Sequence, residues 1–157
     1  MIPETDIHEI IQNTSLSNEI NELPIIVTGG TGFIGSWLVT ALDKLSDNRD
    51  IDNLIYALKA DKIEANKASN RLKKNLFIVT SDELQSQLQN GSLPGFGHVF
   101  YCATSTKYDT NDPRNDFEKT LNLAEQILRI LEMSRTVPNF VNLSSGAVYG
   151  PPLTKEK

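Results

Sequence analysis

Cysteine is nearly absent from this sequence, since Cys102 is the single one among 157 residues. One cysteine cannot form a disulfide within the chain, and it cannot supply an all-cysteine zinc site. Basic residues are also in the minority, and the formal net charge of −5 argues against a nucleic-acid-binding surface. His98 has no second histidine nearby, so no metal site is expected.

Long apolar runs are missing too. No run approaches the roughly 20 apolar residues that a membrane-spanning helix needs, so we expect no membrane partner. The first residues, Met1 to Asp6, lack the basic start and the apolar stretch of a signal peptide. We therefore expect a cytoplasmic protein.

The sequence contains instead a series of short apolar runs of strand length. Most of them are continuous rather than alternating, which is typical of strands covered on both faces. We expect five strands, at residues 24–28, 54–58, 76–79, 98–102 and 140–143.

Between these runs, apolar residues recur at spacings of three and four, which predicts helices over 33–45 and 117–133. Alternating strands and helices form right-handed βαβ units around a parallel sheet. The expected fold class is therefore α/β, with a parallel sheet over residues 24–157. Residues 1–23 are expected to form an N-terminal extension.

That extension contains a short amphipathic pattern. Ile7, Ile10 and Ile11 fall on one side of a predicted helix. Asp6 and Glu9 have the spacing of a capping box, which predicts that this helix begins at Asp6.

The most informative segment follows the first expected strand. Residues 28–35 read Thr-Gly-Gly-Thr-Gly-Phe-Ile-Gly, a G-x-x-G-x-x-G spacing between a strand and a helix. Glycine permits the tight turn, and its missing Cβ lets a pyrophosphate approach the backbone. The N–H groups at the start of the following helix attract phosphate. The segment predicts a dinucleotide-binding loop, in which Gly35 would let the helix pack close to the strand.

The loop also allows two other interpretations. A P-loop would also use Gly30 and Gly35, but Ser36 and Trp37 follow where its phosphate-binding lysine should stand. We therefore reject the P-loop. A glycine-rich turn that binds nothing is the remaining alternative.

The loop resembles the T-G-x-x-G-x-x-G fingerprint of the extended short-chain dehydrogenase/reductase family, the nucleotide-sugar epimerases and dehydratases. Two further segments fit in the right order. Residues 98–104 look like the family's fourth strand with its alanine pair, with Thr104 in place of the second alanine. Residues 143–150 look like the fifth strand and its S-S-x-x-V-Y-G motif. The resemblance covers residues 24–157, and it implies a Rossmann-like doubly wound parallel sheet that is truncated after about the fifth strand.

The resemblance implies a catalytic role for Ser145, whose hydroxyl would hydrogen-bond the substrate oxygen that is oxidised or reduced. A serine that merely ends a strand and caps the turn is the alternative. The resemblance also implies which residues contact the cofactor. They lie in the glycine loop and just after the fourth strand: Gly29, Thr31, Gly32, Phe33, Ile34, Gly35, Ala103 and Thr104.

Two more positions bear on the cofactor. Lys59 stands where NAD-dependent members of the family have an acidic residue for the ribose hydroxyls, so we expect NADP rather than NAD. Alternatively Lys59 points into water and Asp61 serves the ribose, in which case NAD remains open. Asp82 stands where members of the family have an aspartate that faces the adenine, so it is a candidate contact. It could equally be the N-cap of the next helix.

The family's Tyr-x-x-x-Lys pair, which exchanges the substrate proton, does not occur in these 157 residues. We therefore expect the N-terminal half of an NAD(P)-dependent epimerase, dehydratase or reductase acting on a nucleotide sugar, with no turnover by this chain alone. A non-catalytic dinucleotide-binding or regulatory module is the alternative. An uncovered strand edge and apolar face after the fifth strand should make the chain a homo-oligomer.

Overall fold

A computed structural model describes residues 3–13, 23–49, 54–58, 75–103 and 112–144. The elements in chain order are α1 (Glu4–Asn13), β1 (Ile25–Thr28), α2 (Phe33–Arg49), β2 (Ile55–Leu58), β3 (Leu76–Val79), α4 (Ser81–Gln89), β4 (His98–Tyr101), α5 (Pro113–Met133) and β5 (Asn139–Asn142).

The five strands form one sheet in the order β3-β2-β1-β4-β5, and every neighbouring pair is parallel. Ile25 at the start of the central strand lies opposite Ile55 on one side and His98 on the other. The expected α/β fold with a doubly wound parallel sheet is therefore confirmed, and each strand lies within one residue of its expected position.

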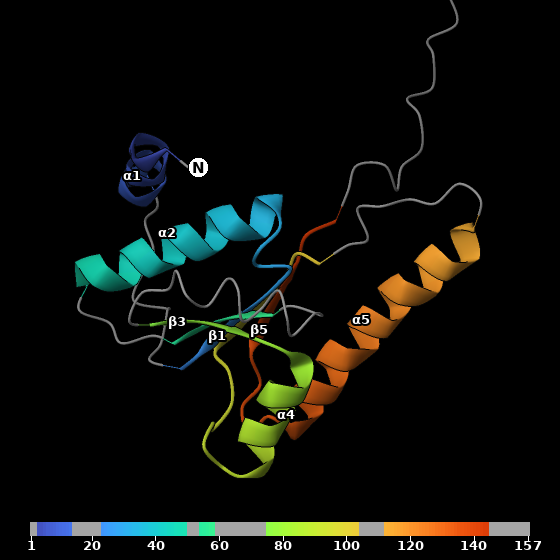
Figure 1. Cartoon of the computed structure of the whole chain (residues 1–157). Helices are drawn as coiled ribbons and strands as arrows, with labels where there is room; N and C mark the ends of the chain where they lie inside the picture. Colours follow the sequence, from blue (N-terminus) through green and yellow to red (C-terminus); the bar gives the residue numbers. More distant parts are fainter. Residues whose placement is uncertain (1–2, 14–22, 50–53, 59–74, 104–111, 145–157) are drawn as a thin grey trace, which may run out of the picture.

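Helices cover both faces of the sheet (Figure 1). On one face lies α2, with α1 packed against its outer side, and on the other face lie α4 and α5. Successive side chains of β1 pack on opposite faces of the sheet. Ile26 belongs to the core under α4 and α5, and Val27 belongs to the core under α2. Burying each such side chain contributes about 1.5–3 kcal/mol.

The helix ends differ from the sequence expectations. Helix α1 begins at Glu4, so Asp6 is inside the helix and not its N-cap; its Oδ1 atom accepts a hydrogen bond from Thr5 Oγ1. Helix α5 begins at Pro113, because the side chain of Asp112 accepts from Asn115 N and proline suits the first helical position. Apolar periodicity alone misses this polar first turn.

The amino ends of β4 and β5 are fastened by Thr136. Its hydroxyl accepts a hydrogen bond from the N–H of Phe96 at 2.9 Å and donates to the carbonyl of Phe96 at 2.8 Å. A side chain on Gly95 would collide with the Thr136 hydroxyl. The N–H of Gly97 also donates to the carbonyl of Pro24, just before β1. This end of the sheet is closed.

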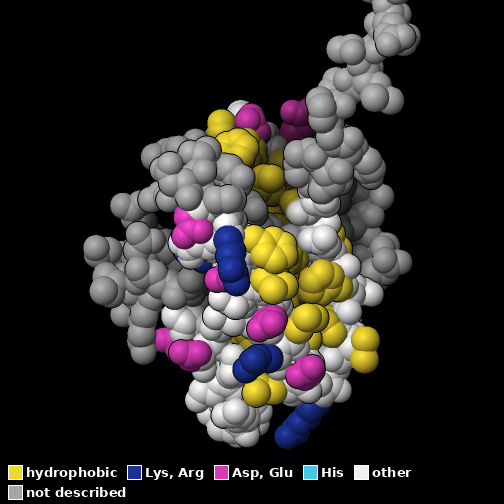
Figure 2. All heavy atoms as spheres, turned by 90° about the vertical axis from the view of Figure 1, so that its right-hand side faces the viewer, with side chains coloured by type: hydrophobic (Ala, Val, Ile, Leu, Met, Phe, Trp, Pro, Cys, Tyr) yellow, Lys and Arg dark blue, Asp and Glu magenta, His cyan; other side chains and the backbone are white. Residues whose placement is uncertain are grey.

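Helix α5 is apolar on its outer side as well. Phe117 is 68% exposed and Leu128 is 56% exposed, and Leu121 lies between them along the helix. Phe140 and Val141 of the edge strand β5 are also exposed. Figure 2 shows apolar side chains gathered on the face that carries α5. Among the residues that the structure describes, no helix is long and apolar enough to span a membrane.

Candidate functional site

The glycine loop makes a tight turn between β1 and α2. Gly29 has a φ of 63°, in the left-handed region where a glycine costs least. The N–H of Gly32 donates to the carbonyl of Gly29 at 2.8 Å, and the N–H of Ser36 donates to the carbonyl of Gly32 at 2.9 Å. The chain therefore passes from the buried central strand into a helix within a few residues.

The glycines are required for different reasons. A Cβ on Gly35 would overlap the backbone of Gly29, so the helix packs directly on the turn. A Cβ on Gly30 would lie 2.7 Å from that of Ala57 on β2, a requirement that the G-x-x-G-x-x-G spacing does not contain. A Cβ on Gly32 would meet only the carbonyl oxygen of Gly29, at 3.1 Å. The space beyond Gly32 is therefore open to a ligand.

The start of α2 faces solvent beside this space. Thr31, Phe33 and Ile34 are exposed, and Phe33 is 83% exposed. The first turn of α2 contains no acidic residue. Helix N-termini carry unpaired N–H groups and partial positive charge, so an anion is favoured here.

Thr28, the last residue of β1, fastens the loop to the next strand. Its hydroxyl oxygen accepts hydrogen bonds from the N–H groups of Cys102 and Ala103, both at 3.0 Å. Gly29 lies against the same segment, because a Cβ on it would be 3.0 Å from the Cα of Ala103. Thr28 thus sets the distance between the carboxyl ends of β1 and β4.

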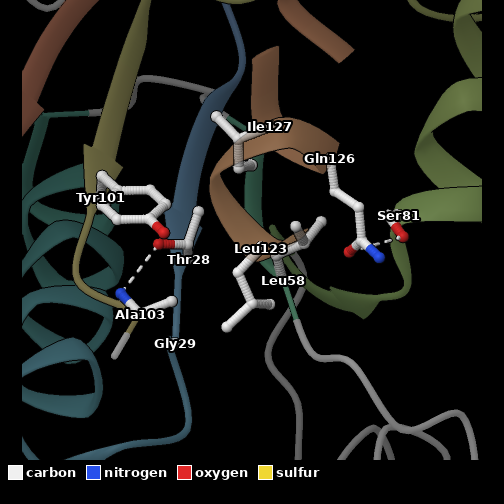
Figure 3. Close-up of a pocket in the computed structure, with 9 residues that line it drawn as sticks. All are labelled: Thr28, Gly29, Leu58, Ser81, Tyr101, Ala103, Leu123, Gln126 and Ile127. Atoms are coloured by element: carbon white, nitrogen blue, oxygen red, sulfur yellow. Dashed lines mark hydrogen bonds between the residues drawn. The ribbon is translucent and has the colours of Figure 1, made fainter. Parts of the chain in front are cut away.

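A pocket opens at the carboxyl ends of the strands, on the side covered by α5 (Figure 3). The pocket is shallow: its enclosed volume is about 20 Å³, roughly that of one water site, and beyond it the mouth is open to solvent. The lining residues are Thr28, Gly29, Leu58, Ser81, Tyr101, Ala103, Leu123, Gln126 and Ile127. None of these nine side chains is charged. In open parallel sheets ligands bind at this edge, where the chain reverses its direction across the sheet.

Polar groups lie at two places in the pocket. Ser81 Oγ donates to Gln126 Oε1 at 3.4 Å, which joins the start of α4 to α5. The hydroxyl of Tyr101 is buried and makes no hydrogen bond to any residue that the structure describes. Burial raises the pKa of Tyr101 above its usual value of 10.0, so the hydroxyl keeps its proton at neutral pH.

Asp82 lies beside the pocket, but it is not the N-cap of α4. Thr80 is the N-cap and forms a capping box with Glu83: Thr80 Oγ1 accepts from Glu83 N, and Glu83 Oε2 accepts from Thr80 N. The N-cap interpretation of Asp82 is therefore wrong. Asp82 is exposed within the first turn, and it is Ser81 that lines the pocket. A contact between Asp82 and the adenine stays a prediction.

The structure brings together part of the expected site. Gly29 and Ala103 lie in contact at the pocket, and Gly32 and Gly35 belong to the adjoining turn. Three expected site residues, Lys59, Thr104 and Ser145, lie outside the described residues.

Cys102 lies next to the site without lining the pocket. Its side chain is half-buried, and burial raises the pKa of the thiol, which disfavours the reactive thiolate. Packing is therefore the role that its surroundings favour.

Sequence reasoning did not find several residues of the pocket. Thr28 was visible as the first letter of the fingerprint, but its hydrogen bonds to the segment after β4 require the three-dimensional pairing of β1 with β4. Leu123, Gln126 and Ile127 read as ordinary helix residues. Only the crossing of α5 over the end of the sheet brings them to the site.

Comparison with known proteins agrees with this geometry. The model of the NAD dependent epimerase/dehydratase family matches residues 25–157. A dihydroflavonol 4-reductase of Hordeum vulgare is 30% identical over 131 residues, covering 80% of this chain and 35% of the relative. A vestitone reductase of Medicago sativa is 27% identical over 126 residues, covering 78% and 38%. The chain thus spans just over a third of the length of these curated relatives.

One solved structure shares the fold. The ADP-L-glycero-D-manno-heptose-6-epimerase of Helicobacter pylori superposes with a TM-score of 0.57 at 17% identity, covering 90% of this chain and 45% of that one. At that identity the similarity concerns the fold alone. The family model, in contrast, matches from the first residue of β1 to Lys157. This chain belongs to the NAD dependent epimerase/dehydratase family.

Proposed function

We propose that this chain is the cofactor-binding portion of an oxidoreductase that uses NADP in preference to NAD. The family is described as NAD dependent, which makes a nicotinamide dinucleotide its cofactor. The single observation that carries the proposal is the open space above Gly32, bordered by the start of α2 and adjoining the pocket between β1 and α5.

The residues of the site fit a dinucleotide. Gly32 and the N-terminus of α2 would hold the pyrophosphate, because a side chain at Gly32 would stand in the open space. Leu58 and Ala103, with the α5 side chains of the pocket, offer an uncharged surface for the base. The Tyr101 hydroxyl is a buried polar group without a protein partner, as expected for a site that a ligand completes.

When bound, the dinucleotide supplies a hydride acceptor or donor. This chain's own residues bind and orient it, and the apolar pocket wall excludes water from one side. Ser145 would hold a hydrogen bond to the substrate oxygen, as the family motif implies. The missing Tyr-x-x-x-Lys pair leaves the proton-transfer step without a candidate in these 157 residues. Turnover therefore requires residues other than those of this chain.

The first experiment is titration of the purified chain with NADP and with NAD by isothermal titration calorimetry. We expect NADP to bind more tightly. Absence of binding by either dinucleotide, in a chain whose circular dichroism shows the folded α/β content, would contradict the proposed function.

The preference for NADP is assigned to Lys59, whose cation would pair with the 2′-phosphate. Lys59→Glu should lower the ratio of NADP affinity to NAD affinity by roughly tenfold, which corresponds to about 1.4 kcal/mol for one charge-assisted contact. Lys62→Glu, with the same change in charge, is the matched control. An unchanged ratio in Lys59→Glu would remove Lys59 from the site.

The substrate is proposed to be a nucleotide sugar, the class that the sequence resemblance implies. The named relatives favour a second candidate, since dihydroflavonol 4-reductase and vestitone reductase act by name as reductases. Hydride transfer can be followed at 340 nm with the whole protein that contains this chain. Nucleotide sugars and a dihydroflavonol, offered separately, distinguish the two. Binding of the dinucleotide without any turnover would favour a regulatory module instead.

A second copy of the chain is the proposed partner for the apolar outer side of α5. Phe117, Leu121 and Leu128 are exposed there, and exposed apolar surface favours association. Sedimentation velocity should show a concentration-dependent dimer that Leu121→Gln weakens. A monomer at all concentrations would contradict the homo-oligomer. We also propose the cytoplasmic location that the sequence predicts.

A further inference from the structure

The hydroxyl of Tyr101 is the one buried side-chain polar atom without a hydrogen-bond partner among the residues that the structure describes. Buried hydroxyl groups are nearly always paired, because leaving one unpaired costs free energy. A phenylalanine would fill the same place without that cost. The hydroxyl therefore calls for an explanation that packing does not supply.

The position of Tyr101 indicates what the partner is. The residue lies on β4, facing the same layer as Thr28, and both line the pocket (Figure 3). Its ring stacks on Phe140 of β5, with centroids 6.3 Å apart, which fixes the direction of the hydroxyl. The Thr28 hydroxyl already accepts two backbone N–H groups and makes no hydrogen bond to Tyr101. An acceptor that enters the pocket would find this donor free.

The lining of the pocket selects among acceptors. Among the residues that the structure describes, none of the nine that line it is charged, so at this wall a phosphate or carboxylate would be desolvated without a counter-ion. Leu58, Leu123 and Ile127 offer apolar contact instead, which suits a flat ring. A purine combines such a ring with neutral nitrogen acceptors at its edge.

We propose that Tyr101 is a binding residue whose hydroxyl donates a hydrogen bond to a ring nitrogen of the adenine base. This inference rests on the proposed binding of a nicotinamide dinucleotide. It makes Tyr101 a determinant of base specificity, and the buried hydroxyl lowers the stability of the free protein in exchange for that contact.

The test combines one substitution with altered bases. In Tyr101→Phe, affinity for the dinucleotide should fall roughly five- to tenfold by calorimetry. Dinucleotides in which N1, N3 or N7 of the adenine is replaced by CH identify the acceptor. One of the three should bind the wild-type chain more weakly by the same factor, and Tyr101→Phe should not distinguish it from the parent dinucleotide.

Thermal stability of the free protein is the second readout. Tyr101→Phe should melt at the same temperature as the wild type or higher, because it removes an unpaired buried hydroxyl. Tyr56→Phe is the matched control: Tyr56 is buried in the same apolar cluster on β2, but it does not line the pocket, so its loss should leave affinity unchanged.

Each outcome decides between the proposals. If the wild-type chain binds no dinucleotide, the proposed function fails. If it binds, and Tyr101→Phe binds equally well or loses affinity equally for all three altered bases, only the role of Tyr101 fails. A lower melting temperature in Tyr101→Phe would show that the hydroxyl supports the fold instead, and would also overturn the inference.

Discussion

At each end of the sheet a threonine hydroxyl makes two hydrogen bonds to backbone groups, but the two ends differ in what these bonds leave open. At the amino end, the Thr136 hydroxyl both accepts from and donates to the backbone of Phe96, a residue with no exposed surface. At the carboxyl end, the Thr28 hydroxyl accepts from two backbone N–H groups, and beside it a pocket remains open. The hydrogen bonds of Thr136 close the amino end, whereas those of Thr28 hold the carboxyl ends of β1 and β4 at a fixed distance.

This difference separates stability from function within one small sheet. The closed end satisfies the polar groups of the turn that it fastens. The open end leaves the Tyr101 hydroxyl unpaired and exposes Phe33 at the start of a helix, two features that a purely structural edge would avoid. Natural proteins depart from local rules mainly at functional sites, and here both departures fall at the same edge.

We expect the largest effect from a substitution that disrupts the glycine loop at the open end of the sheet. Gly35→Ala places a methyl group into the backbone of Gly29, which cannot move without opening the turn. We expect a loss of about 3 kcal/mol of stability and no detectable dinucleotide binding. Gly91→Ala is the control for backbone strain without overlap, because Gly91 has a positive φ of 77° and nothing lies near its missing side chain. Urea unfolding and calorimetry measure both, and undiminished binding by Gly35→Ala would refute this account of the loop.

A matched pair of substitutions tests the comparison directly. Thr28→Val and Thr136→Val each replace a hydroxyl by a methyl group of similar size and leave two backbone groups unpaired. Each should cost about 2 kcal/mol of unfolding free energy. Only Thr28→Val should also reduce dinucleotide affinity, by roughly tenfold (about 1.4 kcal/mol), because only Thr28 sets the width of the site. Serine at either position should restore what valine removes. Equal affinity in the two valine variants would show that the ends of the sheet are not functionally distinct.

The smallest expected effect lies at the side of the pocket. Thr80→Ala removes the N-cap of α4 and half of its capping box. The loss should be about 1 kcal/mol of stability with little change in affinity, because Thr80 does not line the pocket. Denaturant titration measures the loss. A large fall in affinity would show that the start of α4 takes part in binding more directly than its contacts indicate.

Local patterns were sufficient to predict the sheet and its loop. Continuous apolar runs located the strands, and the alternation with helices fixed the parallel arrangement. Gly29, Gly32 and Gly35 could be recognised because their spacing is local. Gly30 could not, since its need for a small side chain comes from Ala57 across the loop.

The rest of the site depends on pairings between distant segments. Tyr101 reads in the sequence as one more strand aromatic, and nothing near it shows that its hydroxyl will be buried without a partner. The helix-cap predictions were wrong for a different reason, because caps are local. In α4, Thr80 and Glu83 already have the spacing of a capping box, so Thr80 and not Asp82 is the N-cap. Helix α1 begins at Glu4, before the predicted cap Asp6.

The joint between β1 and β4 also has a consequence for folding kinetics. These strands are neighbours in the sheet but not along the chain, because α2, β2, β3 and α4 lie between them. Closing so long a loop is slow, so this joint should form late, after the pairs that are consecutive in the chain. Thr28 and Tyr101 both lie on it. A ligand held there therefore meets a surface that exists only once folding is nearly complete, and it should prolong the life of the native state by slowing unfolding while leaving the rate of folding unchanged.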